Sequence, residues 1–182
     1  KKWNDTLAKL AMSSDDCVKA EAFVTICQMT TDRKSKEHFS SMSILIDHIV
    51  ALLNSSKFVP EAVDALAGLI DGNSVRQLTA HANIFELFSR LTMNGGPLAS
   101  KVAHVLRRMA NHISVRDKFH QELLDALLSC ASMSKREVRL WAVKGLLVQS
   151  ESSANSFYLS RSSPVLDVAA QHARDAEPII RK

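Results

Sequence analysis

Aromatic residues, glycine and proline are all scarce in this chain of 182 residues, and their scarcity argues against a sheet architecture. Aromatic residues make up 5% of the chain, and there are five glycines and four prolines. Strands favour aromatic and β-branched residues, and small sandwiches and barrels need frequent turn residues. Leucine and alanine are abundant instead, and both are strong helix formers. The composition therefore favours an all-α fold.

Cysteine is also rare, and long apolar runs are absent. The three cysteines, Cys17, Cys27 and Cys130, are an odd number without C-x-x-C spacing. This pattern favours reduced thiols over a disulfide framework, and it predicts a cytoplasmic or nuclear location. No apolar run approaches the roughly 20 residues that a membrane span needs.

The net charge of +4 is distributed unevenly along the chain. Residues 96–145 carry nine cations and four acids, a net charge of +5, whereas residues 1–95 carry ten cations and eleven acids, a net charge of −1. Such a local excess is either a solvated basic flank or a patch that binds an acidic partner.

An internal repeat of forty residues runs through the chain. Steps of forty from the segment 61–69 give five columns that are apolar at nineteen of their twenty positions. Within each repeat these positions are spaced i, i+4, i+5, i+8 and i+11, which is one face of an α-helix. The repeat therefore predicts one long helix in every forty residues. The columns are Val18, Phe58, Leu98 and Val138; Ala22, Ala62, Val102 and Ala142; Phe23, Val63, Ala103 and Val143; Ile26, Leu66, Leu106 and Leu146; and Met29, Leu69, Met109 and Gln149.

Shorter elements separate the predicted long helices. Apolar stretches at 44–53, 84–91, 123–128 and 165–170 predict a medium helix in each repeat, and short elements are expected at 74–76 and 114–116. Each medium stretch holds an acid, which we expect in the first turn because the helix dipole favours it there. These acids are Asp47, Glu86, Asp125 and Asp167. Pro60 fits a first helical turn, residues 94–97 predict a turn, and the segment 134–137 is typical of a capping box.

The order of short, medium and long helix at a period near forty resembles the armadillo repeat, with the HEAT repeat as its close relative. The Glu-Ala-x-x-Ala-Leu-x-x-Leu segment at 61–69 and its three echoes carry the resemblance, which covers essentially the whole chain. It implies an all-α, right-handed α-solenoid of about four armadillo-like repeats. We expect one domain, 1–182, as a fragment of a longer solenoid, with repeats at 31–70, 71–110 and 111–150 and partial repeats at 1–30 and 151–182. Residues 18–29 and 38–69 also look similar to UCS-type myosin chaperones.

The resemblance also implies where a partner would bind, because the long helix lines the groove of armadillo proteins. The groove positions are one before, two after and six after the column that contains Ala22. They lack the Trp and Asn pair of the importin-α type, so a classical nuclear import signal is not the expected ligand. The expected partner-binding residues are an acidic pair and a basic group: Glu61 and Asp64; and Lys101, His104, Arg108, Trp141 and Lys144.

The basic group predicts a protein or peptide ligand with an acidic or phosphorylated segment. Two alternatives remain open at this stage. Trp141 can simply pack between adjacent repeats, and Lys101, Arg108 and Lys144 can be ordinary solvated surface.

No pattern in the chain predicts catalysis, a metal or a cofactor. His104, His112 and His120 are eight residues apart, which is not a zinc-ligand spacing, and no glycine-rich phosphate loop or nucleophile elbow occurs. We therefore expect a non-catalytic interaction scaffold and not an enzyme. A UCS-like client-binding segment and a HEAT-like nucleic-acid-binding module are the alternatives, and the latter should bind with a steep salt dependence.

Overall fold

The computed structural model describes residues 2–55, 57–113, 118, 120–151, 159, 161, 167, 168 and 170. Across these residues the chain forms helices joined by turns, without a strand. It divides into two compact units, Lys1–Leu87 and Phe88–Lys182, each with its own core. The short element predicted at 114–116 lies outside the described residues, as does most of the stretch 165–170.

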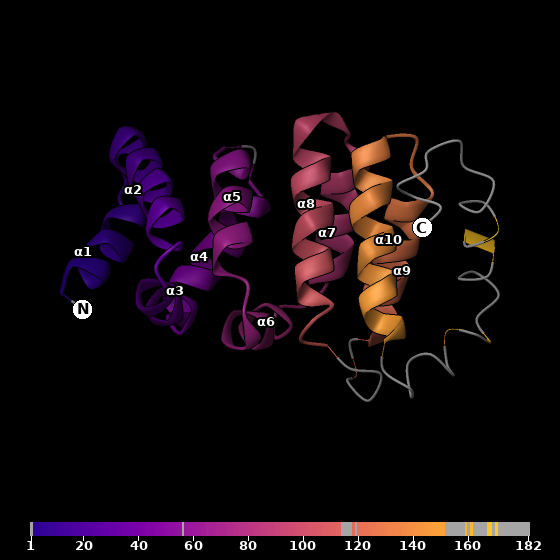
Figure 1. The fold of residues 1–182 in the computed structure, drawn as a ribbon. Coiled ribbons are helices and arrows are strands. Elements are labelled where there is room, and N and C mark those ends of the chain that lie inside the picture. The colour runs from indigo at the N-terminus through magenta and orange to yellow at the C-terminus, as the bar shows by residue number, and fades with distance from the viewer. Residues whose placement is uncertain are drawn as a thin grey trace. The chain divides into compact units, whose positions relative to one another are not determined.

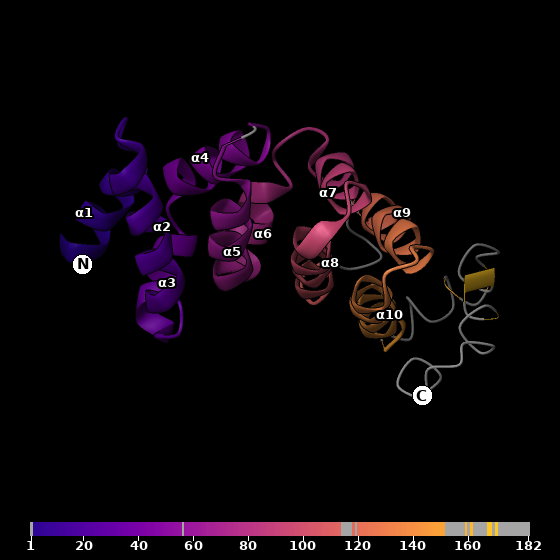
Figure 2. The same cartoon turned by 90° about the horizontal axis from the view of Figure 1, so that it is seen from above.

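The first unit contains two long helices, α2 and α5, that lie side by side, with α4 behind them (Figures 1 and 2). The short helices α3 and α6 both pack against α4, and α1 packs against α2 and α3. The order short, medium, long is thus complete in α3, α4 and α5. The bounds are α1 (Lys2–Ala11), α2 (Asp16–Met29), α3 (Arg33–Ser40), α4 (Ser43–Leu53), α5 (Val59–Leu69) and α6 (Gly72–Leu78).

The second unit repeats this layering. Helix α7 (Ile84–Met93) spans the division between the units, and α8 (Gly96–Met109), α9 (His120–Ala131) and α10 (Arg136–Ser150) follow it. The long helices α8 and α10 lie side by side in one layer, and α9 packs behind both (Figures 1 and 2). The boundaries at 31–70, 71–110 and 111–150 stay a prediction.

The forty-residue columns form the cores of both units. Ile26, Leu66 and Leu106 are completely buried, and Leu146 is 8% exposed. The column that contains Ala22 is buried at all four positions as well. Burial of these side chains supplies much of the apolar area that stabilises each unit.

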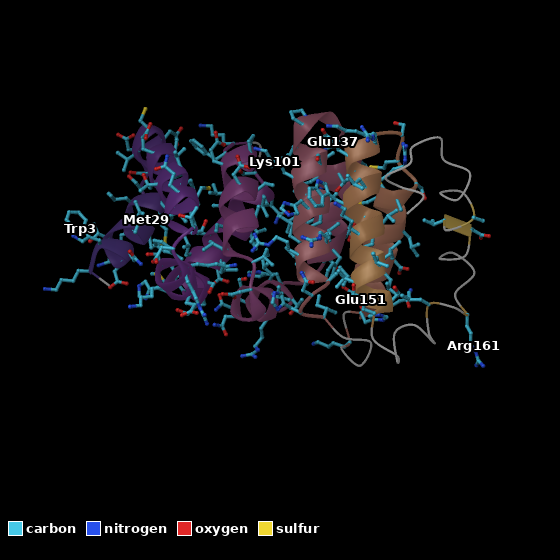
Figure 3. The ribbon with its side chains drawn as sticks, viewed as in Figure 1. Trp3, Met29, Lys101, Glu137, Glu151 and Arg161 are labelled. Carbon is cyan, nitrogen blue, oxygen red and sulfur yellow. The ribbon has the colours of Figure 1, made fainter. Side chains whose placement is uncertain are left out.

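The column that contains Val18 is not buried along its whole length. Val138 is completely buried in the second unit, whereas its equivalent Val18 is 36% exposed. Val18 lines an open apolar groove of about 370 Å³ between α1 and α2, together with Leu7 and Leu10. Trp3 on α1 is 83% exposed (Figure 3). The same apolar column is thus core in α10 and surface in α2.

Helix caps depart from the sequence prediction at one place. The capping box expected at 134–137 is wrong, because Lys135 occupies the N-cap of α10 and its side chain makes no capping bond. The structure instead forms a capping box at Asp71 and Ser74, at the start of α6. Ser40 donates a further hydrogen bond of 2.5 Å to Asp71, which links the end of α3 to the start of α6.

The acids of the medium helices have a role that the sequence did not indicate. Glu86 lies in the first turn of α7 as predicted, but Asp47 is not in the first turn of α4, and Asp125 is not in the first turn of α9. Asp47 Oδ1 lies 3.0 Å from Nε2 of His81, which follows α6. In the same way Asp5 Oδ1 on α1 lies 2.7 Å from Nε2 of His38 on α3. Asp5 and Asp47 therefore join α1 and α4, respectively, to a histidine that lies 33 or 34 residues later in the chain.

The close approach of α2 and α5 gives a first prediction, at Gly68. A Cβ atom there would overlap the hydroxyl of Thr30 and lie 3.0 Å from its Cβ. Alanine is normally the better helix former by about 1 kcal/mol. We nevertheless expect Gly68→Ala to lower the free energy of unfolding by about 1–2 kcal/mol, as overpacked positions do. Urea denaturation followed by circular dichroism measures the change.

The matched control for Gly68→Ala is the double variant with Thr30→Ala, which removes the overlapping hydroxyl. It should recover part of the lost stability relative to Thr30→Ala alone. A Gly68→Ala variant that is more stable than the original chain would contradict the close approach.

Candidate functional site

The predicted groove positions lie on the accessible side of the long helices. None of the twelve is buried in the structure. The apolar columns on the same helices are mostly buried, so the register deduced from the repeat separates the two faces correctly. The twelve positions are Glu21, Val24, Gln28, Glu61, Asp64, Gly68, Lys101, His104, Arg108, Trp141, Lys144 and Val148.

In the second unit a glycine brings two of these helices together. A Cβ atom added to Gly145 on α10 would lie 3.3 Å from the Cα atom of Arg107 on α8. It would also lie 2.8 Å from Leu127 Cδ2. The absence of a side chain at Gly145 therefore lets α10 approach the α8 backbone one turn after Trp141.

Trp141 is the centre of the contacts between α8 and α10. Its indole stacks on the ring of His104, with centroids 4.3 Å apart and planes 29° apart. Lys144 Nζ lies 5.0 Å from the centroid of the indole, and Arg107 Cζ lies 5.8 Å from it. Both distances are within the range of cation–π attraction. Trp141, His104, Arg107 and Lys144 are called the Trp141 cluster below.

The cluster concentrates positive charge. Helix α8 has no acidic residue and α10 has only Glu137, an exposed residue in its first turn (labelled in Figure 3). Desolvation lowers the pKa of His104 below its ordinary value of 6.5, and the charges of Arg108, Arg107 and Lys144 lower it further. His104 is therefore predominantly neutral at pH 7, which suits its stacking on an aromatic ring.

Arg107 is the member of the cluster that the sequence prediction missed. It directly follows Leu106 of the buried column, so the repeat placed it beside the core and not on the binding face. In the structure Arg107 is partly exposed, and its guanidinium reaches the Trp141 ring. Its Nε atom is buried without a hydrogen-bond partner among the described residues. The usable signal was its spacing, because Arg107 lies one turn after His104 on the same side of α8.

The remaining predicted site residues are placed as follows. Lys101 is exposed on α8, one turn before His104 (Figure 3). Arg108 is partly exposed and acts on the pKa of His104 through its charge. Glu61 and Asp64 lie on α5 in the first unit, and both are partly exposed. The second unit thus brings together His104, Trp141 and Lys144 of the predicted set and adds Arg107 to them.

The sequence left open whether Trp141 binds a partner or packs between adjacent repeats, and its position in the structure is compatible with both. It packs between two long helices, as the structural interpretation expected, yet it stays partly exposed. Its ring holds a histidine and two cations in one place. The residue is therefore a platform for charged side chains as well as a packing element.

The described residues also give information on metal binding, thiol reactivity and membrane spans. They contain no group of three His, Cys, Asp or Glu side chains arranged to hold a metal ion. Burial raises the pKa of Cys130 to about 11, which disfavours the reactive thiolate. Among the helices described, none is long and apolar enough to cross a membrane.

Comparison with known proteins identifies the fold. No protein-family model and no curated protein matches the chain. A designed armadillo repeat protein, solved in complex with the peptide (KR)4, matches 96% of this chain and 76% of its own, with a TM-score of 0.72 and 17% identity. One engineered protein matches 98% of this chain and 74% of its own, with a TM-score of 0.67 and 17% identity. Another matches 98% of this chain and 93% of its own, with a TM-score of 0.61 and 14% identity.

These likenesses confirm the predicted fold class, an all-α solenoid of the armadillo type. They do not show the similarity to UCS-type myosin chaperones. The designed armadillo repeat protein with a bound peptide is similar to this chain in fold alone.

Proposed function

We propose that this armadillo-type repeat chain is a non-catalytic binding segment, which holds a protein or peptide partner along its long helices. The Trp141 cluster is the observation that carries the proposal. It gathers an aromatic ring, a histidine and two cations on the accessible side of α8 and α10. Trp and Arg are the side chains that most often dominate the energy of protein interfaces.

The charge of the cluster selects an acidic or phosphorylated segment as the ligand. Guanidinium and ammonium groups form charge-assisted hydrogen bonds with carboxylate and phosphate oxygens. Arg107 and Lys144 come from different helices and converge on one indole ring, so both can approach the same anionic group. The bound peptide (KR)4 of the designed protein is basic, and we propose ligands of opposite charge for this chain.

The ring contacts also favour binding by restricting the cations before the ligand arrives. Long cationic side chains lose about 0.5–1.5 kcal/mol of rotamer entropy each when an interface immobilises them. Arg107 and Lys144 already lie against Trp141, so part of that loss has occurred in the free protein. The guanidinium of Arg107 and the ammonium of Lys144 thus both stay close to the Trp141 ring.

A nucleic-acid-binding module is the second candidate, because residues 96–145 carry a net charge of +5. Backbone binding needs several cations spread along the phosphates. Two of these cations already bond to the protein's own backbone: Lys135 donates to the carbonyl of Gly96 at 2.5 Å, and Arg139 to that of Ser134 at 2.5 Å. The compact Trp141 cluster therefore supports a peptide ligand better. We further propose that the chain works in the cytoplasm or nucleus, which the odd number of cysteines and their lack of C-x-x-C spacing support.

Charge reversal in the second unit tests the proposed function. We expect Arg108→Glu combined with Lys144→Glu to weaken binding of a glutamate-rich peptide by about tenfold or more, because like charges then face the ligand. Isothermal titration calorimetry measures the affinity for a 12-residue peptide of alternating glutamate and serine, and for the same peptide with phosphoserine. Thermal melts first establish that the variant is folded.

The matched control is Lys9→Glu combined with Lys34→Glu, which changes the net charge by the same amount at two exposed positions of the first unit. Its affinity should stay close to that of the original chain. Equal losses of peptide affinity in both double variants would mean that the affinity depends on the net charge of the chain and not on the cations of the second unit. Tighter binding of duplex DNA than of either peptide, with a steep log-linear salt dependence, would favour the nucleic-acid candidate.

A further inference from the structure

We infer that His104 couples binding of an anionic partner at the Trp141 cluster to the uptake of a proton, so that the partner binds more tightly as the pH falls. The inference rests on the proposed function. It concerns the regulation of the same site.

The geometry places His104 among positive charges. Its ring is stacked on Trp141 of α10 at 4.3 Å, and Lys144 reaches the same indole from one turn further along α10. On its own helix, Arg107 and Arg108 follow it by three and four residues, which is the spacing of adjacent side chains on one face. A group that contacts these cations therefore also comes close to the imidazole.

The charges that act on His104 in the free protein are all positive. They are Arg107 and Arg108 on α8 and Lys144 on α10, and no carboxylate among the described residues adds to them. Glu137 on α10 and the carboxylates of α9, Glu122 and Asp125, are exposed to solvent. These cations and partial burial lower the pKa of His104, so the imidazole stays neutral at pH 7.

An anionic ligand reverses this balance. Its charge offsets the repulsion from the cations and favours the imidazolium, so the pKa of His104 rises on binding. Linkage then requires that a lower pH strengthens binding, since protonation and ligand favour each other. The sign follows directly: affinity increases as the pH falls from above the pKa of the complex to below that of the free protein, which is itself under 6.5.

The size of the effect depends on how far binding raises the pKa. Each full unit gives a tenfold gain in affinity between the high-pH and low-pH limits. A rise of half a unit to one unit would make binding roughly three- to tenfold tighter in the low-pH limit than in the high-pH limit, and the affinity at pH 5.5 should exceed that at pH 7.5 by up to that factor. The second ring nitrogen of the imidazolium also becomes a donor that the neutral ring lacks.

The probe must not titrate in the same range. A phosphoserine has a second pKa near 6 and would obscure the result. We therefore choose a 12-residue peptide with sulfotyrosine and glutamate, since glutamate titrates near 4.3. Isothermal titration calorimetry at pH 7.5, 6.5 and 5.5 gives the affinity. Repeating it in two buffers of different ionisation enthalpy gives the number of protons taken up.

The decisive variant is His104→Gln, which keeps a planar polar side chain and removes the titration. Binding at pH 7.5 should be retained within about threefold, while the gain at pH 5.5 and the proton uptake should disappear. His112→Gln is the matched control, because His112 is an exposed histidine shortly after the end of α8. It should keep the full pH dependence. Circular dichroism at each pH establishes that all three chains are folded.

The outcomes separate the inference from the proposed function. Binding of the probe with no proton uptake, or with an unchanged pH dependence in His104→Gln, overturns the inference and leaves the proposed function standing. Failure of the folded chain to bind the probe at any pH overturns both. An NMR titration of the imidazole signals, assigned by comparison with His104→Gln, reads the pKa directly, and it should rise when the probe is added.

Discussion

Leu106→Ala should lower the free energy of unfolding by about 2–5 kcal/mol, the range observed when a buried leucine is truncated. The side chain is completely buried on α8, which packs against both α9 and α10. Truncation removes its apolar contacts and leaves a cavity that rigid neighbouring helices cannot close fully. Leu66→Ala, at the equivalent position of α5, should have an effect of similar size. Urea denaturation followed by circular dichroism at 222 nm measures both.

Leu147→Ala is the matched control, because Leu147 lies on α10 but is 59% exposed. The same chemical change should cost less than about 1 kcal/mol there. If Leu147→Ala lowered the free energy of unfolding as much as Leu106→Ala, the assignment of the buried and accessible faces of the long helices would be wrong.

The success of the repeat at Leu66 and Leu106 has a simple physical basis. A column of large apolar residues at helical spacing must face a neighbouring helix, and the step of forty fixes which residues share that column. Neither the helical spacing nor the step of forty requires knowledge of which residues far apart in the sequence come into contact. The helix order and the main cores could therefore be predicted from the sequence, and so could the accessible position of Trp141.

Hydrogen bonds and other polar contacts of particular side chains could be predicted less well from the sequence. The Ser-x-x-Glu pattern at 134–137 suggested a cap, but Lys135 takes that place, and the carbonyl of Ser134 accepts a hydrogen bond from Arg139 instead. Asp47 was assigned to the helix dipole, whereas it lies beside His81. Both outcomes depend on side chains that meet only after the chain has folded, and a local pattern does not contain that information.

The site was predicted in part for the same reason. The register correctly put His104, Trp141 and Lys144 on the accessible side, because exposure follows from helical periodicity. It missed Arg107, whose long side chain reaches the Trp141 ring from the edge of the core face. Periodicity assigns a direction to each Cα–Cβ bond but not the reach of a long side chain.

Gln149→Leu should lower the free energy of unfolding by about 2–4 kcal/mol, although it restores the apolar pattern of its column. Gln149 is the one polar residue among the twenty column positions, and it is 1% exposed. Its Nε2 donates hydrogen bonds to the carbonyls of Ala110, at 2.5 Å, and Ile113, at 2.8 Å. Leucine has a similar volume but no donor, so two buried carbonyls would lose a partner. Gln28→Leu, at an exposed position of α2, should change stability by less than about 0.5 kcal/mol.

Gln149→Glu distinguishes the lost donor from a change of packing, since the two side chains have nearly the same shape. At pH 7 the introduced carboxylate would face two carbonyl oxygens and should destabilise the chain by more than leucine does. Burial and this repulsion raise its pKa in the folded state above the unfolded value near 4.3. The folded state then binds the proton more tightly than the unfolded state, so the loss shrinks as the pH falls through the folded pKa. Denaturation at pH 7.5 and 5 should therefore show the Gln149→Glu variant recovering relative to Gln149→Leu. A constant difference would mean that Gln149 stabilises α10 through its shape and not through its amide donor.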